Sequence, residues 1–167
     1  AGELVETSVD NGDGTFTYNV PVREGYTWSD GSPITANDWE FTFDTVKSLS
    51  LGGNFLSSYP YSCEDEEGTA KNCVVSVVAS DDYTVSITFN YDPGLSTWQY
   101  GTAQGIAFSK AYWEQYATDK ETLYAHDATN APVASAFVYD KLEQGAFYTW
   151  KYDANTMWYG GTTTIYD

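Results

Sequence analysis

Few residues in this chain of 167 could carry out chemistry, because it has one histidine, two cysteines and 24 acidic residues. The histidine, His126, lies in the polar segment HDATNAP, where we expect a solvated side chain. One imidazole argues against histidine-based metal sites and Ser-His-Asp sets, which need a positioned imidazole with partners. The motifs GxSxG, HExxH and the P-loop are absent from the sequence. We therefore predict a protein that is not an enzyme and uses no cofactor.

The acidic residues could supply the carboxylate pair of a glycosidase, but their spacing selects no pair. A glycosidase domain stays an alternative that needs two carboxylates about 5–10 Å apart in one cleft. The run DNGDG at residues 10–14 could also be read as a calcium loop. Placing Gly14 at the invariant glycine of such a loop puts Val9 and Val20 at ligand positions, so the run predicts a turn.

The two cysteines, Cys63 and Cys73, flank the acidic segment CEDEEGTAKNC. They lack CxxC spacing and a nearby histidine, which argues against zinc. We predict that they form a disulfide, which closes a hairpin and contributes about 3 kcal/mol through loop closure. A disulfide indicates an oxidising, exported location, and two free thiols in a cytosolic protein are the alternative.

The formal net charge of the chain is −17. This charge argues against nucleic acid and against an anionic membrane surface as partners, since both attract Lys and Arg. Solubility in an exposed medium explains the charge, and attraction of cationic ligands is a second interpretation. No apolar run reaches the roughly 18 residues of a membrane span. The chain opens without a basic and apolar leader, as a processed or truncated chain would.

Alternating apolar side chains mark the predicted strands, which turn residues separate into hairpins. These strands lie at residues 16–22, 74–78 and 83–89, and a further hairpin turns near residues 143–145. For the helices, Thr35 and Asp38 form a capping box, which predicts a helix over residues 36–49 with Trp39, Phe43 and Val46 on one face. A short helix near Ser109 and a polar loop over residues 118–135 follow. The sum predicts an α+β fold with a mixed, mostly antiparallel sheet and two or three helices.

Several aromatic residues lie outside these periods and could line a groove that stacks on sugar rings or peptide side chains. They are Tyr59, Tyr61, Trp98 and Tyr100. Ordinary packing in a core or at a sheet edge is the alternative for each of them.

Residues 23–38, REGYTWSDGSPITAND, resemble a signature of the family 5 extracellular solute-binding proteins, the peptide-, dipeptide- and nickel-binding receptors of ABC importers. Asp-Gly-x-Pro followed by Thr-Ala-x-Asp is specific in combination. Further stretches are similar to the family in the same order, so that the resemblance spans almost the whole chain. They are residues 4–20, 77–89, 106–116 and 131–161.

The chain departs from the family pattern at three places. Residues 134–137 read Ala-Ser-Ala-Phe where the family has Gly-Thr-Gly-Pro/Ala-Tyr, which indicates a backbone that does not need glycine there. Phe108 replaces the usual proline, and residues 153–155 lack the usual arginine.

The resemblance implies that residues 1–167 are a single domain, a fragment of the first lobe of a two-lobed periplasmic-binding-protein-like fold. It implies capture of a peptide or related small solute for the permease of an ABC transporter, by a monomer with no nucleic-acid partner. It also implies an extracellular, lipid-anchored cell-surface or periplasmic location. The alternative is an independent extracellular carbohydrate-binding or adhesion module.

The resemblance also implies which segments approach the ligand cleft, namely residues 55–61 and 100–104. From these segments we expect the ligand-binding residues to be Tyr59, Tyr61, Tyr100 and Gln104. The residues of the turn and helix start at 28–43 are expected to be structural, with no contact to the ligand.

Overall fold

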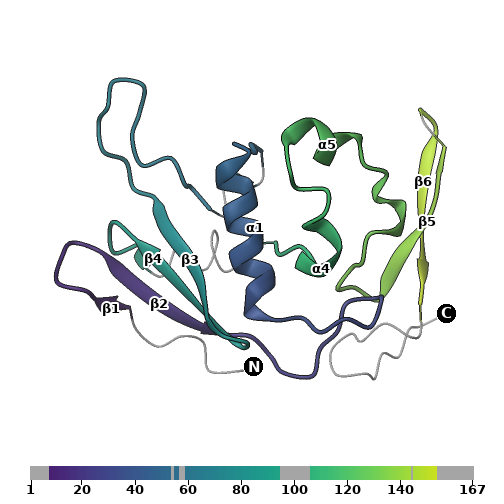
Figure 1. The fold of residues 1–167 in the computed structure, drawn as a ribbon, viewed down its shortest axis with the longest axis horizontal. Coiled ribbons are helices and arrows are strands. Elements are labelled where there is room, and N and C mark those ends of the chain that lie inside the picture. The colour runs from purple at the N-terminus through teal and green to yellow at the C-terminus, as the bar shows by residue number, and fades with distance from the viewer. Residues whose placement is uncertain (1–7, 54, 57–58, 95–105, 144, 154–167) are drawn as a thin grey trace. The chain divides into compact units, whose positions relative to one another are not determined.

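The computed structural model describes residues 8–53, 55–56, 59–94, 106–143 and 145–153 (Figure 1). The chain divides into two compact units. Unit 1 comprises residues 1–22 and 35–108, and unit 2 comprises residues 23–34 and 109–167.

Unit 1 contains a four-stranded antiparallel sheet with the strand order β1-β2-β4-β3. The strands are β1 (Val9–Asp10), β2 (Phe16–Pro21), β3 (Val74–Asp81) and β4 (Thr84–Phe89). The predicted strands are confirmed, although β3 continues three residues beyond its predicted end. It does so because the turn to β4 is tight, and the Asp81 carboxylate accepts the backbone N–H of Tyr83 at 2.8 Å.

The helix of unit 1, α1 (Ala36–Ser48), begins as the capping box predicts. The backbone N–H of Thr35 donates to Asp38 Oδ2 at 2.9 Å. The helix ends at Ser48, and Ser50 takes a φ of 51°. A left-handed residue at this place stops the helix before the Gly-Gly pair at which the sequence predicts the stop.

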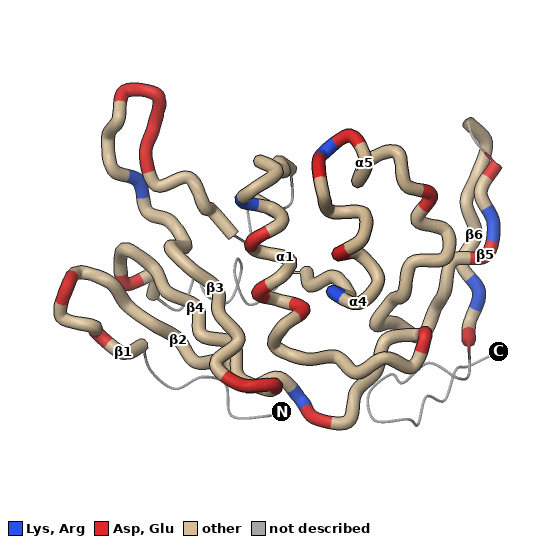
Figure 2. The backbone as a smooth tube through the Cα atoms, in the orientation of Figure 1, with Lys and Arg blue, Asp and Glu red and all other residues tan. Residues whose placement is uncertain are grey.

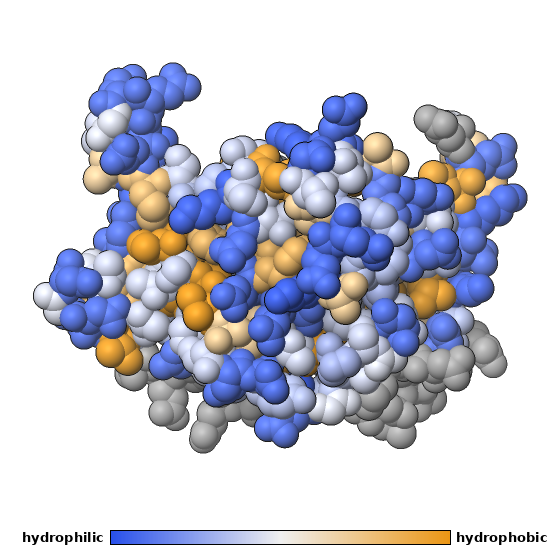
Figure 3. All heavy atoms as spheres, in the orientation of Figure 1, coloured by the Kyte–Doolittle hydropathy of each residue, from blue (hydrophilic) through white to orange (hydrophobic). Residues whose placement is uncertain are grey.

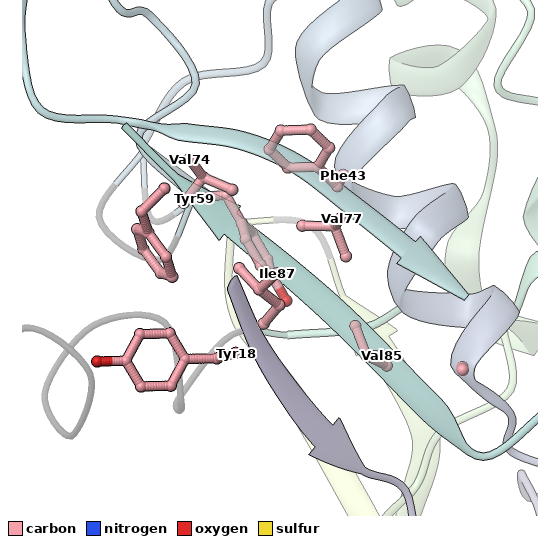
Figure 4. Close-up of a cluster of buried hydrophobic side chains, with 9 residues drawn as sticks. Tyr18, Phe43, Tyr59, Val74, Val77, Val85 and Ile87 are labelled. Atoms are coloured by element: carbon pink, nitrogen blue, oxygen red, sulfur yellow. The ribbon is translucent and has the colours of Figure 1, made fainter. Parts of the chain in front are cut away.

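One face of α1 covers the sheet, chiefly β3, and encloses the core of unit 1 (Figure 4). Phe43 and Val46 are buried as predicted, and Trp39 packs at the edge of the core. The buried cluster consists of Tyr18, Ala36, Phe43, Tyr59, Val74, Val77, Val85, Ile87 and Phe89.

Unit 2 contains short helices and an antiparallel hairpin. They are α4 (Lys110–Trp113), α5 (Lys120–Ala125), the 3₁₀ turn η2 (Ala128–Asn130), β5 (Phe137–Glu143) and β6 (Phe147–Tyr152). The helix near Ser109 and the hairpin are confirmed. The polar loop predicted over residues 118–135 is wrong, because α5 and η2 lie within it. Asp119 and Asp127 cap them by accepting the backbone N–H groups of Thr122 and Thr129.

Candidate functional site

Tyr59, the first expected ligand residue, lies in the core of unit 1. Its side chain is fully buried and packs edge-to-face against Phe43, with the ring centroids 5.9 Å apart. Burial raises the pKa of the Tyr59 phenol above its usual value. The hydroxyl has no hydrogen-bond partner in the described part of the chain. The ring therefore fixes the segment that follows α1, and it presents no surface within unit 1.

Replacing Tyr59 with phenylalanine is expected to raise the free energy of unfolding of unit 1 by about 1 kcal/mol. The variant keeps the buried ring and removes a polar group that loses its hydration without gaining a partner. Chemical denaturation monitored by circular dichroism measures the change.

The matched control for Tyr59→Phe lies two residues away. Tyr61 Oη donates to the Leu51 carbonyl at 3.2 Å, so Tyr61→Phe should lower the same free energy by about 1 kcal/mol. If Tyr59→Phe destabilises unit 1 as much as Tyr61→Phe does, the Tyr59 hydroxyl is not an orphan in the folded protein.

Tyr61, the second expected ligand residue, is only half-buried. Its bond to Leu51 ties the segment to the chain just beyond the C-terminal end of α1. Tyr61 thus combines a fixed position with an accessible surface, which is the combination that a preorganised contact needs. The other two expected ligand residues, Tyr100 and Gln104, lie outside the described residues.

The start of the same segment is held by Phe55, whose ring meets that of Phe108 edge-to-face at 5.3 Å. The backbone N–H of Phe108 donates to Thr42 Oγ1 on α1 at 2.8 Å. The proline that the family has at this position has no N–H and could not make this bond. The departure at Phe108 therefore adds an attachment to α1.

The predicted disulfide between Cys63 and Cys73 is formed, with the two Cα atoms 5.2 Å apart. It closes a hairpin in which the Lys71 N–H donates to the Cys63 carbonyl at 2.7 Å. The tip of the hairpin is acidic (Figure 2). There the Asp65 carboxylate accepts the N–H groups of Thr69 and Glu67, and these bonds, with that of Thr69 the stronger, hold the pKa of Asp65 below its usual value.

The turn in the stretch WSDGSP belongs to unit 2 and is built from its own side chains. Asp30 Oδ1 accepts the backbone N–H of Ser32 at 2.9 Å, and Gly31 takes a φ of 86°, which glycine adopts without strain. Ser29 joins this turn to the segment before β5. Its N–H donates to the Val133 carbonyl at 3.0 Å, and its Oγ accepts the Val133 N–H at 3.1 Å.

This attachment connects two stretches that the sequence showed only as separate family signatures. Ser29 was not singled out from the sequence, because Val133 lies 104 residues further along the chain. Residues 134–137 follow directly. Among the described residues Ser50 is the only non-glycine with a positive φ, so the loss of glycines at 134–137 is compatible with their backbone, as expected.

His126 is not a solvated loop residue, contrary to the expectation from the sequence. Its ring stacks on that of Tyr116 with centroids 3.5 Å apart and meets the edge of Trp113 at 5.5 Å. Its Nε2 lies 2.9 Å from Tyr112 Oη, in hydrogen-bond contact. The three aromatic residues, expected to share one face of the helix near Ser109, thus enclose His126.

The described residues hold no group of three or more His, Cys, Asp or Glu side chains that could bind a metal ion. Within the same residues, no helix has both the length and the apolar character required to cross a membrane. What the structure does hold is a segment, residues 55–61, fastened by Phe108, Leu51 and the disulfide that follows it. Such a fastened segment can present side chains to a ligand without rearranging.

Most of the chain matches one family model, described as bacterial extracellular solute-binding proteins, family 5 Middle, over residues 2–166. The dipeptide-binding protein DppE of Bacillus subtilis (strain 168) is 32% identical over 75 residues, which cover 43% of this chain and 14% of DppE. The oligopeptide-binding protein OppA of the same strain is 32% identical over 93 residues, 52% of this chain and 16% of OppA. The chain thus matches less than a fifth of the length of either relative.

Solved structures share the fold over almost the whole chain. The oligopeptide-binding protein AppA of Bacillus subtilis, in complex with a nonapeptide, has a TM-score of 0.60 and 18% identity, covering 92% of this chain and 28% of AppA. Listeria monocytogenes OppA bound to peptide has a TM-score of 0.59 and 18% identity, covering 93% of this chain and 30% of OppA. These relatives are two-lobed binding proteins, and this chain corresponds to a partial segment of one. The predicted α+β fold is therefore confirmed.

Proposed function

Because the chain belongs to the bacterial extracellular solute-binding proteins of family 5, we propose that it is part of the ligand-capturing component of an ABC importer. The observation that carries the proposal is the family match over residues 2–166. In this proposal residues 1–167 are part of the first lobe, the protein performs no chemistry on its ligand, and a membrane permease receives the ligand.

The ligand that we propose is a peptide. Two curated relatives are named for dipeptide and oligopeptide binding, and two solved relatives hold peptides. No comparison supports the alternative of an independent carbohydrate-binding or adhesion module. The net charge of −17 favours peptides with cationic side chains over acidic ones, since like charges repel.

The contact residues that we propose are Tyr61, Tyr100 and Gln104, with Tyr59 beneath them. Support for Tyr61 comes from its half-buried position and its bond to Leu51. Tyr59 is assigned to hold the segment in place, because its ring is buried against Phe43. Tyr100 and Gln104 enter through the family resemblance alone.

We propose that the protein works outside the cytoplasm, anchored by lipid to the cell surface or free in the periplasm. The family is named for extracellular proteins, and the disulfide between Cys63 and Cys73 suits an oxidising compartment.

The test is a thermal-shift measurement on the intact protein, as purified from its source, with defined peptides of two to nine residues. A bound peptide at about 100 times its Kd should stabilise the protein by about 2.7 kcal/mol. Tyr61→Ala is expected to weaken the binding about tenfold. The matched control is Tyr124→Ala, because Tyr124 is an exposed tyrosine in unit 2.

The result that would overturn peptide capture is the absence of any melting shift with peptides of every charge class, together with no peptide detected by mass spectrometry in the purified protein. Equal weakening by Tyr61→Ala and Tyr124→Ala would instead overturn only the assignment of Tyr61.

A further inference from the structure

The hairpin of β5 and β6 has one face made entirely of large apolar and aromatic side chains. The register pairs Phe137 with Tyr152, Tyr139 with Trp150 and Leu142 with Tyr148. An irregularity between Tyr139 and Lys141 brings Leu142 back to the side of the first two pairs. We call this the aromatic face, defined by residues Phe137, Tyr139, Leu142, Tyr148, Trp150 and Tyr152.

The opposite face of the hairpin is polar and electrically balanced. Asp140 pairs with Lys151 at 3.7 Å, and Lys141 lies over the Phe147 ring at 5.1 Å. With Glu143, the hairpin carries two acidic and two basic side chains, whereas the whole chain carries −17 (Figure 2). The hairpin is therefore a neutral part of a strongly acidic protein.

Most of the aromatic face is exposed, and apolar atoms reach the surface over the hairpin (Figure 3). The exposed fractions are 66% for Tyr148, 57% for Leu142, 51% for Trp150, 46% for Phe137 and 43% for Tyr152. A two-stranded hairpin is marginally stable in water unless another element covers it. A contiguous apolar patch of this kind marks an interaction surface.

We propose that the aromatic face docks on the same face of a second copy of this chain, forming a homodimer with two-fold symmetry. Each aromatic side chain can bury about 150–250 Å². Half of that for five side chains gives roughly 500 Å² per copy and roughly 1,000 Å² in total, which reaches the lower limit of a specific interface.

The ring geometry favours a protein partner over a polysaccharide. The planes of Tyr139 and Trp150 meet at 81°, and those of Tyr148 and Trp150 at 90°. Rings at right angles do not form the flat platform on which sugar rings stack, whereas they interdigitate with side chains of a like surface.

Charge favours the hairpin as the place where two copies meet. Two molecules of charge −17 repel each other, but the neutral hairpins do not add to that repulsion. A two-fold axis places identical surfaces together, so each aromatic face meets its own copy. This proposal replaces the monomer expected from the sequence, and it is independent of the ligand.

Sedimentation equilibrium of the intact chain over a concentration series tests the proposal. The wild type is expected to dimerise, and added salt should tighten the dimer by screening the repulsion. Tyr148→Ser with Trp150→Ser should raise the dimer Kd at least about tenfold. The matched control is Phe147→Ser, a neighbouring aromatic of 44% exposure on the opposite face, which should leave the Kd unchanged.

A second measurement on the unaltered chain guards against variants that fail to fold. Hydroxyl-radical labelling of Tyr148 and Trp150 should increase on dilution, while labelling of the exposed Tyr124 stays constant. A wild type that is monomeric at every concentration overturns the proposal, and so does a Phe147→Ser variant that dissociates as readily as the double variant. Protection of the rings by a soluble polysaccharide in a monomeric protein also overturns it.

Discussion

Replacing Phe43 with alanine is expected to lower the free energy of unfolding of unit 1 by about 3–5 kcal/mol, the largest effect of any single change considered for this protein. Phe43 is 2% exposed, and it packs edge-to-face against Tyr59 in the core. The truncation removes apolar contacts and leaves a cavity, which the neighbouring strands β3 and β4 fill only in part because the sheet fixes their positions.

Denaturation in urea, followed by circular dichroism, measures the loss at Phe43. Phe41→Ala on the same helix is the matched control, since Phe41 is half-exposed and lies outside the buried cluster. The control should cost less than about half as much. Equal losses for the two variants would mean that Phe43 does not carry the contact between α1 and the sheet.

Removing the disulfide through Cys63→Ser and Cys73→Ser is expected to lower the free energy of unfolding by about 3 kcal/mol. The bond closes a loop with a sequence separation of 10, and in the chain-entropy model its main effect is to restrict the unfolded chain. For a unit of this size the melting temperature should fall by about 4–8 °C for each kcal/mol lost.

Calorimetry with and without a reductant measures the effect of the disulfide. The double-serine variant serves as its own control, because a reductant should not shift its melting temperature further. Limited digestion with trypsin adds a local measure, since Lys71 lies within the closed hairpin and should become a cleavage site once the bond is lost. Identical melting of the oxidised and reduced protein would contradict the proposed contribution.

The sequence was informative where a structure depends on neighbours a few residues apart. The capping box at Thr35 and Asp38 predicts the start of α1 because both partners lie within one helical turn. The alternation at 83–89 predicts β4 for the same reason. The helix α5 was missed because its six residues show no apolar period, and Asp119 alone marks its start.

The sequence was least informative where side chains from distant positions meet. His126 has a polar local sequence, and only its contacts with Tyr116 and Trp113 bury it. Tyr59 was expected at a ligand because it breaks the local periods, whereas the structure buries it beneath Phe43. No local pattern reports burial by a residue that is far away in sequence, so the role of such a residue cannot be predicted from its neighbours alone.

The bond between Phe108 and Thr42 has a consequence for the order in which the chain folds. Unit 2 can form only when residues 23–34 meet residues 109–167, as in the contact of Ser29 with Val133. The entropy lost in closing a loop grows with the number of free residues inside it. Once α1 is formed, its start at Thr35 and the attachment of Phe108 to the same helix hold both ends of the intervening chain close together. Unit 1 is therefore the template on which unit 2 folds, and although residues 23–34 leave the ribosome early, they find their partners only after nearly the whole chain has been synthesised.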